Sequence, residues 1–297
     1  MPASTTNPPH RQASDGFIVV AVLWILGALA TLATIYAIYV TDTAVAFTVH
    51  DERLQAEAMV SAGLELTAYQ LAVPQEGRPT RGTFTFRIGH ANIGVDYRPE
   101  AARIDLNAAP KELLSGLFTA LGARREDADY YADRVVGWRL PPTETVDTEA
   151  SNYRTAGLKY QPRGGFFAHV GELSLVMGLP ELMVERATPF LTVYSGQAQV
   201  DVLDAAPQVI AALPGMTPDR LQSILAQRAA TPQNGQLVSA LLGPSQSSAT
   251  VEGGKSTRVA IRVVFDNGHQ AASEVVILRL DEGPEPFRVL SWRDQLD

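Results

Sequence analysis

One apolar stretch constrains this chain more than any other feature. Residues Phe17–Val40 read FIVVAVLWILGALATLATIYAIYV and include no charged side chain. At ~1.5 Å of rise per residue, a helix of this length crosses the ~30 Å hydrocarbon core of a bilayer. The apolar core of a signal peptide is shorter, ~7–15 residues, so the stretch predicts a membrane helix that is retained.

The residues that flank this stretch predict its orientation. The polar segment 1–16 carries Arg11 as its only full positive side-chain charge, whereas Asp42 and Asp51 follow the apolar stretch. Positive residues next to a membrane helix stay on the cytoplasmic side. We therefore expect the N-terminus inside the cytoplasm and the body of the protein outside it.

The switch from polar to apolar sequence is abrupt, because Gly16 is followed at once by Phe17 and the apolar run. This pattern resembles a type IV prepilin, which prepilin peptidase cuts after the glycine. The resemblance implies that Gly16 and Phe17 form the processing site, that residues 1–16 are the leader, and that Phe17 becomes N-methylated. An uncleaved signal anchor is an alternative. A long signal peptide cut after the A-x-A match at residues 44–46 is another, although its apolar core is too long.

Composition excludes several classes of function for the body. The chain has no cysteine, so disulfides, thiolate metal sites and a cysteine nucleophile are excluded. Its net charge of −8 argues against a polyanionic partner such as DNA or an anionic lipid surface. The histidines show no metal-ligand spacing, and no Ser, His and Asp cluster suggests a catalytic triad. We therefore expect a protein that is not an enzyme.

The helical pattern continues beyond the membrane stretch. Residues 51–71 are rich in Ala, Leu, Glu and Gln, all strong helix formers, which predicts one helix from Phe17 to about Val73. The alternative is two helices broken near residues 41–43. Leu54, Ala58 and Leu64 are interpreted as part of an apolar stripe that packs against neighbouring subunits.

Period-two alternation predicts strands at both ends of the body. Three early runs suggest an antiparallel meander (83–88, 93–97 and 103–106), two late ones flank an Asn-Gly turn (259–265 and 274–280), and one more follows (287–292). Helices are predicted between them, near 110–121, 125–138, 170–177 and 180–192, with a loop over 140–165. This order indicates an α+β fold in which a helical domain is inserted into the sheet.

A weak internal repeat lies within the helical region. Ile104–Pro110 reads IDLNAAP and Val202–Pro207 reads VLDAAP, each followed by a helical pattern. We interpret each copy as a strand that ends at Asn107 or Asp204, whose side chain caps the first turn of the next helix. Proline is tolerated in that first turn.

Two short segments, Leu213–Pro218 and Met177–Pro180, look like helix-hairpin-helix turns. In nucleic-acid-binding proteins such turns present backbone N–H groups to phosphates. Between Arg103 and Arg228, however, twelve Lys and Arg stand against fifteen Asp and Glu, whereas a phosphate-binding surface is basic. The turns are therefore interpreted as structural helix pairs. A membrane-anchored helix-hairpin-helix protein that binds DNA remains an alternative.

The motifs of the helical region give the resemblance its detail. They are the joint of Ile104–Pro110, the signature with Phe166, Phe167, Gly171-Glu172-Leu173 and Val176–Leu179, the segment Pro189–Tyr194, and the repeat ending in Ala-Leu-Pro-Gly at Gly215. Together they resemble the minor pseudopilin K family of type II secretion, also called general secretion pathway protein K.

That resemblance implies a long N-terminal pilin helix packed on an antiparallel sheet, with a large helical domain inserted in the sheet. The expected segments are 1–16 (leader), 17–40 (transmembrane part of the helix), 41–106 (pilin-like helix and first strands), 107–195 (inserted helical domain) and 196–297 (second helical joint and C-terminal strands). It further implies a structural role near the tip of a pseudopilus. The expected partners are minor pseudopilins I and J, other pseudopilins, the inner-membrane assembly platform and prepilin peptidase. The protein is expected as a single-pass protein of the bacterial inner membrane with its body in the periplasm. A minor pilin of a type IV pilus or competence system is the alternative within this class.

Position 21 and the segment after Trp138 bear on these expectations. Counting Phe17 as the first mature residue, the fifth is Ala21, where pilins and most pseudopilins carry a glutamate that pairs with a neighbouring N-terminal ammonium. A subunit without that glutamate fits the tip of the fibre. Trp138 is followed by Arg139-Leu140-Pro141-Pro142 instead of the aspartate-rich run that the family associates with calcium. We expect no cofactor. Glu144, Asp147 and Glu149 remain candidate calcium ligands, with a solvated acidic loop as the alternative.

Overall fold

The computed structural model describes residues 15–72, 80–141, 149–231, 234–243, 246–283 and 285–295; the side chains of residues 15–17, 44–50 and 295 lie outside this description. The chain divides into two units, Met1–Ala58 and Met59–Asp297. Each is described by itself below.

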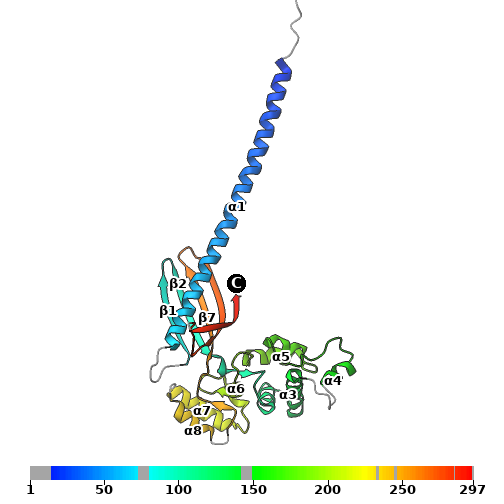
Figure 1. Ribbon diagram of the computed structural model, residues 1–297, viewed down its shortest axis with the longest axis vertical. Helices are drawn as coiled ribbons and strands as arrows, with labels where there is room; N and C mark the ends of the chain where they lie inside the picture. Colours follow the sequence, from blue (N-terminus) through cyan, green and yellow to red (C-terminus); the bar gives the residue numbers. More distant parts are fainter. Residues whose placement is uncertain are drawn as a thin grey trace, which may run out of the picture. The chain divides into compact units, whose positions relative to one another are not determined.

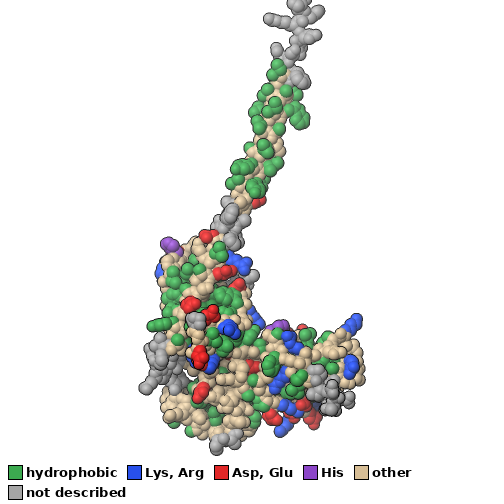
Figure 2. Space-filling view, viewed as in Figure 1, with side chains coloured by type: hydrophobic (Ala, Val, Ile, Leu, Met, Phe, Trp, Pro, Cys, Tyr) green, Lys and Arg blue, Asp and Glu red, His purple; other side chains and the backbone are tan. Residues whose placement is uncertain are grey.

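Helix α1 (Asp15–Ala72) is continuous and has no break near residues 41–43, which confirms the prediction of a single helix (Figure 1). Among the described residues, one segment, Ile18–Thr43, is long and apolar enough to cross a membrane. Its hydrophobic side chains are exposed along the helix (Figure 2). The hydroxyls of Thr34 and Thr41 donate to the carbonyl oxygens four residues earlier, at 2.8 Å, so these polar groups are satisfied within the helix itself.

Five antiparallel strands form the main sheet, in the order β1-β2-β7-β8-β9. Their bounds are β1 (Gly82–Ile88), β2 (Ala91–Pro99), β7 (Ser256–Phe265), β8 (Gln270–Arg279) and β9 (Phe287–Gln295). Strands β7 and β8 form the hairpin predicted around the Asn-Gly turn, where Gly268 has a φ of 88°. The sheet thus joins segments from both ends of the body.

The last turns of α1 cover one face of this sheet. Val60, Leu64 and Ala68 are buried there against the inward-facing residues of three strands, Ile93, Val95, Tyr97, Val259, Ile261, Val263, Val275 and Ile277. The alternation of buried and exposed side chains along β2 gives the sheet one apolar face, which the helix shields from water. This is the packing expected of a pilin helix on its sheet.

The chain between β2 and β7 builds the helical domain. Its α-helices are α2 (Lys111–Ala120), α3 (Arg125–Arg139), α4 (Glu149–Thr155), α5 (Glu181–Ala187), α6 (Pro207–Ala211), α7 (Pro218–Ala230) and α8 (Gly235–Leu242). Three 3-10 turns accompany them, η1 (Glu100–Ala102), η2 (Val170–Leu175) and η3 (Thr188–Phe190). One buried core extends from Ile104 to Leu242, so both copies of the repeat belong to the same inserted domain. The α+β fold with an inserted helical domain is confirmed.

Some local predictions were wrong. The run at 103–106 is not a third strand of the meander: β3 (Ile104–Asp105) pairs in parallel with β4 (Leu191–Thr192). Strand β2 ends at Pro99, which has no N–H for the ladder, and η1 carries the chain away from the sheet. The helix predicted over 180–192 ends in η3 before β4, the predicted loop 140–165 contains α4, and α8 had no predicted counterpart.

The internal repeat is confirmed, but its capping was misassigned. In each copy a two-residue strand pairs in parallel with a second one, β3 with β4 and β5 (Val200–Asp201) with β6 (Ala249–Thr250), and a tight turn leads into a helix pair. Neither α2 nor α6 has a side-chain cap at its N-terminus. Instead, Asp105 accepts the N–H of Asn107 (2.8 Å), and Asp201 accepts that of Leu203 (3.0 Å). We call residues 105–109 with β4 the first joint and residues 201–205 with β6 the second joint.

Candidate functional site

The predicted processing site lies at the start of α1. The backbone of Gly16 and Phe17 is helical, since α1 begins at Asp15. Residues 1–14 lie outside the described part of the chain. Cleavage after Gly16 therefore stays a prediction, and mass spectrometry of the mature N-terminus checks it.

The structure separates the three residues proposed to bind partner subunits. Leu54 is 51% exposed and Ala58 is also exposed, so both side chains are accessible on α1. Leu64 is 2% exposed and packs in the chain's own sheet core, so it is not available to a partner. The six residues from Ala58 to Leu64 turn a helix by about 600°, which brings Leu64 to a different side of α1. Binding of partners by Leu54 and Ala58 remains a prediction.

Sequence reasoning overlooked Tyr69, the exposed aromatic residue of the last turns of α1. Its side chain is 66% exposed, although it lies between the buried Ala68 and the partly buried Leu71. Large aromatic residues contribute strongly to protein interfaces. The signal in the sequence was its helical position relative to Leu64 and Ala68, both of which face the sheet.

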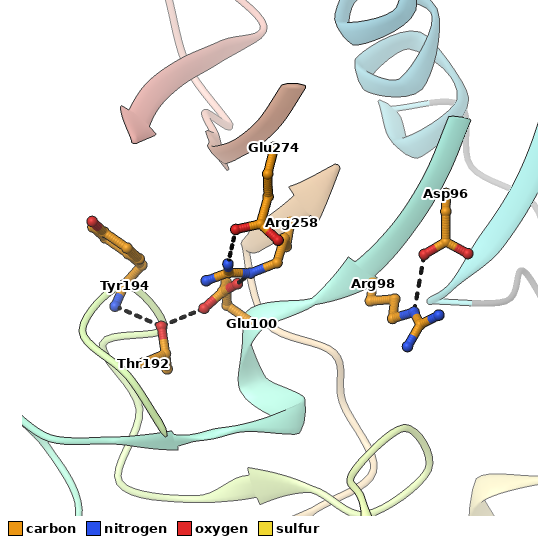
Figure 3. A network of polar contacts seen from close by, with 7 residues as sticks. All are labelled: Asp96, Arg98, Glu100, Thr192, Tyr194, Arg258 and Glu274. Atoms are coloured by element: carbon orange, nitrogen blue, oxygen red, sulfur yellow. Dashed lines mark hydrogen bonds and ion pairs between the residues drawn. The ribbon is translucent and has the colours of Figure 1, made fainter. Parts of the chain in front are cut away.

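A buried ion network joins the sheet to the helical domain (Figure 3). The carboxylate of Glu100 in η1 is 1% exposed and lies 2.5 Å from Arg258 Nε, which comes from β7. Arg258 also pairs with Glu274 of β8, and the hydroxyl of Thr192 in β4 donates to Glu100. Burial lowers the pKa of Arg258, but the bonds to Glu100 and Glu274 outweigh it and raise the pKa above its ordinary value. Removal of one partner from such a buried pair costs about 3–5 kcal/mol, so the network fixes the helical domain on the sheet.

The family-type signature residues form a second buried cluster. The indole of Trp138 stacks on Phe167 with 6.0 Å between ring centroids, and its Nε1 donates to Glu172 over 3.4 Å. Arg163 pairs with the same carboxylate at 2.6 Å. Asn107 holds the backbone of Phe167 from both sides, accepting its N–H at 2.7 Å and donating to its carbonyl oxygen at 3.1 Å. The signature is therefore a packing arrangement inside the domain.

The acidic loop considered for calcium is described only at its end. Glu144 and Asp147 lie outside the described residues, and Glu149 pairs with Arg134 at 2.9 Å. Burial raises the pKa of Glu149. Within the described ranges, the structure brings no three His, Asp or Glu side chains together as a metal site. Calcium binding by this loop stays a prediction.

Comparisons with known proteins agree with this geometry. Residues 98–196 match the family model described as "Type II secretion system (T2SS), protein K". A chain of the crystal structure titled "The Crystal Structure of the GspK-GspI-GspJ complex from enterotoxigenic Escherichia coli Type 2 Secretion System" has the same fold, with a TM-score of 0.59 and 17% identity. The match covers 84% of this chain and 98% of that one. No curated protein matches the chain.

The matched residues 98–196 start at the end of β2 and include the ion network's Glu100 and Thr192 and the whole Trp138 cluster. The family model thus covers the first part of the inserted domain, where most of the sequence motifs lie; the repeat that ends at Gly215 lies beyond the matched residues. The family match over residues 98–196, together with the shared fold, confirms the resemblance to the minor pseudopilin K family of the type II secretion system.

Proposed function

We propose that this chain is a minor pseudopilin at the tip of a type II secretion pseudopilus, where it starts fibre assembly for protein export. The observation that carries the proposal is the domain matched by the protein K model, inserted between β2 and β7 of a sheet that packs on the last turns of the N-terminal helix. Helix α1 would anchor the protein once in the bacterial inner membrane, with the body in the periplasm.

Two features support a place at the end of the fibre. Ala21 stands where pilins and most pseudopilins carry a glutamate, so this subunit offers no carboxylate to the ammonium of a neighbour. A carboxylate within hydrocarbon is costly and is kept where a charge offsets it, whereas a tip subunit has no preceding ammonium to neutralise. The large helical domain would in addition obstruct a subunit stacked above it.

The proposed partners are minor pseudopilins I and J, with which the structurally similar protein was crystallised. The accessible residues Leu54 and Ala58 of α1 support contacts with neighbouring helices. The role is structural and not enzymatic: the buried carboxylates of Glu100 and Glu172 are engaged in internal ion pairs. A minor pilin of a type IV pilus or competence system remains the second candidate, but the family match to protein K favours type II secretion.

Subunit counting tests the tip assignment. In sheared pseudopili, a fluorescent or gold label on this chain is expected about once per fibre, at one end, because the inserted domain prevents stacking above it. A label on the major pseudopilin serves as the control and is expected along the whole length. Label on this chain distributed along the fibre would refute the proposal.

A further inference from the structure

The two joints of the helical domain share one construction but differ at a single carboxylate oxygen. In the first joint, Asp105 Oδ2 accepts the hydroxyl of Ser195 at 3.0 Å and the N–H of Gly196 at 2.8 Å. In the second joint, Asp201 Oδ2 is buried and has no hydrogen-bond partner among the described residues. The side chain of Asp201 is 0% exposed, so bulk solvent does not reach this carboxylate.

The sequence shows why the second joint lacks the hydroxyl donor. Thr192, the last residue of β4, accepts the N–H of Leu106 at its carbonyl oxygen at 2.9 Å. Thr250, the last residue of β6, accepts the N–H of Val202 in the same way and at the same distance, so the two threonines are equivalent. Three residues beyond these threonines, Ser195 of the first joint corresponds to Gly253 of the second. Glycine has no hydroxyl to offer Asp201.

The space beside Gly253 is already occupied by the residues that lead into β1. A Cβ on Gly253 would lie 2.7 Å from Cγ2 of Thr80. The hydroxyl of Thr80 donates to Asp204 of the second joint, and Arg81 Nε lies 3.0 Å from the same carboxylate. The packing of Thr80 beside Gly253 therefore leaves no room for a side chain that could donate to Asp201. The same residues that lead into β1 also contact the second joint through Asp204.

Within the described part of the chain, the charged groups that act on Asp201 are Asp204, Arg228 and Arg81. Arg81 is engaged with Asp204, and Arg228 donates to the carbonyl oxygen of Ala205 at 2.7 Å. Burial raises the pKa of Asp201 to about 6, with Asp204 acting in the same direction and the Leu203 N–H, Arg228 and Arg81 acting against it.

We propose that the second joint is a proton-operated latch. With a proton on Asp201, the joint holds β5 and the helices that follow it against the start of β1; without the proton, the joint loosens. An ionised carboxylate oxygen that is buried and unpaired is costly, and local opening restores its hydration.

The direction of the pH effect follows from proton linkage. The closed joint holds its proton up to a pKa of about 6, whereas an opened joint releases it near the ordinary value of 3.8. Between these values the closed state binds more protons, so its stability falls as pH rises and levels off above pH 6. From pH 5 to pH 7.5 this linkage increases local opening about tenfold.

Hydrogen–deuterium exchange of the full chain in detergent tests the latch. Exchange of peptides covering residues 197–206, corrected for intrinsic rates, is compared with that of peptides covering residues 103–109, which contain the first joint. We expect the ratio of the two to rise about tenfold between pH 5 and pH 7.5. Asp201→Asn should abolish this rise. The matched variant Asp105→Asn should speed exchange in the first joint at both pH values and leave the pH response of the second joint in place.

A ratio that is the same at both pH values in the wild-type chain would rule out the latch, whatever the variants do. A rise that persists in Asp201→Asn would assign it to another group and also overturn the proposal. Should Asp201→Asn fail to fold, Asp201→Ser takes its place, because serine keeps an oxygen for the Leu203 N–H and removes the unpaired one.

Discussion

At the scale of single residues, the helical domain depends on a glycine in the middle of α2. A Cβ on Gly116 would overlap the carbonyl oxygen of Ala212, the residue that follows α6. A backbone oxygen cannot rotate away as the end of a flexible side chain can. Close approach of the two helices is therefore possible only with glycine at this position.

We predict that Gly116→Ala destabilises the protein by about 1–3 kcal/mol, the usual cost of overpacking, although alanine favours an isolated helix by about 1 kcal/mol. The measurement is the urea midpoint followed by circular dichroism. Gly165→Ala is the matched control, since a Cβ there meets nothing within 4 Å, and it should change stability by less than about 0.5 kcal/mol. Equal midpoints for the wild type and Gly116→Ala would show that α2 and α6 do not pack this closely.

The sequence predicted the two joints but not which aspartate closes them. Alignment on Pro110 and Pro207 paired Asn107 with Asp204 and led to their assignment as helix caps. The hydrogen bonds instead show that Asp105 corresponds to Asp201. This correspondence is shifted by one residue from the alignment on the two prolines. Proline is an N-cap in the first copy and a first-turn residue in the second, so the shared proline gave a wrong register. The bonds that decide it come partly from Ser195 and Gly196, far along the chain.

At the scale of elements, different segments of α1 have different surroundings. Leu54 is exposed, whereas Val60, Leu64 and Ala68 face the sheet. Apolar residues of α1 therefore occur in two environments, exposed to solvent and packed on the sheet, and composition alone does not separate them. Helical phase does: residues that differ by about 3.6 share a side, and six residues do not.

This difference makes a matched pair of substitutions informative. Leu54→Asp should preserve the circular dichroism spectrum and abolish co-purification with partner pseudopilins, because a carboxylate then lies in the proposed apolar contact. Leu64→Asp should unfold the sheet region, because a carboxylate without a partner in the sheet core costs several kcal/mol. Asn92→Asp adds the same charge at an exposed position of β2 and should affect neither property. Normal co-purification of Leu54→Asp would move the interface elsewhere.

Strand pairing shows what local sequence could not predict. The antiparallel hairpin β7–β8 was found from its alternation and its Asn-Gly turn, both local signals. Strands β3 and β4 consist of two residues each and pair in parallel across a long stretch of chain, Ile104 with Leu191 and Asp105 with Thr192. A strand of two buried residues shows no alternation of apolar and polar positions. The run at 103–106 was therefore assigned to the antiparallel sheet of the strands that precede it in the sequence.

At the scale of the whole molecule, the body contains two separate cores. The helical domain has its own, with Phe118, Trp138 and Tyr153 among its large side chains. The sheet has the other, which needs residues of α1 to close it. Sequence reasoning predicted this α+β organisation from the order of patterns along the chain. The ion network of Glu100, Arg258 and Thr192 that links the two parts was not predictable, because its members are separated by up to 158 positions.

The two cores predict where the chain can be shortened. A chain that starts at Asp42 keeps Val60, Leu64 and Ala68 on the sheet, so we expect it to fold as a soluble protein without the membrane segment. A chain that starts at residue 73 loses all three, and the apolar sheet face that they cover becomes exposed to water, which is unfavourable in proportion to the apolar area exposed. Circular dichroism, thermal unfolding and size-exclusion chromatography distinguish the two: the longer chain should unfold cooperatively and elute without aggregates, and the shorter one should aggregate or lose its strand signal. If the chain starting at residue 73 were as stable as the longer one, α1 would contribute nothing to the sheet core, and the pilin character of this half of the molecule would have to be abandoned.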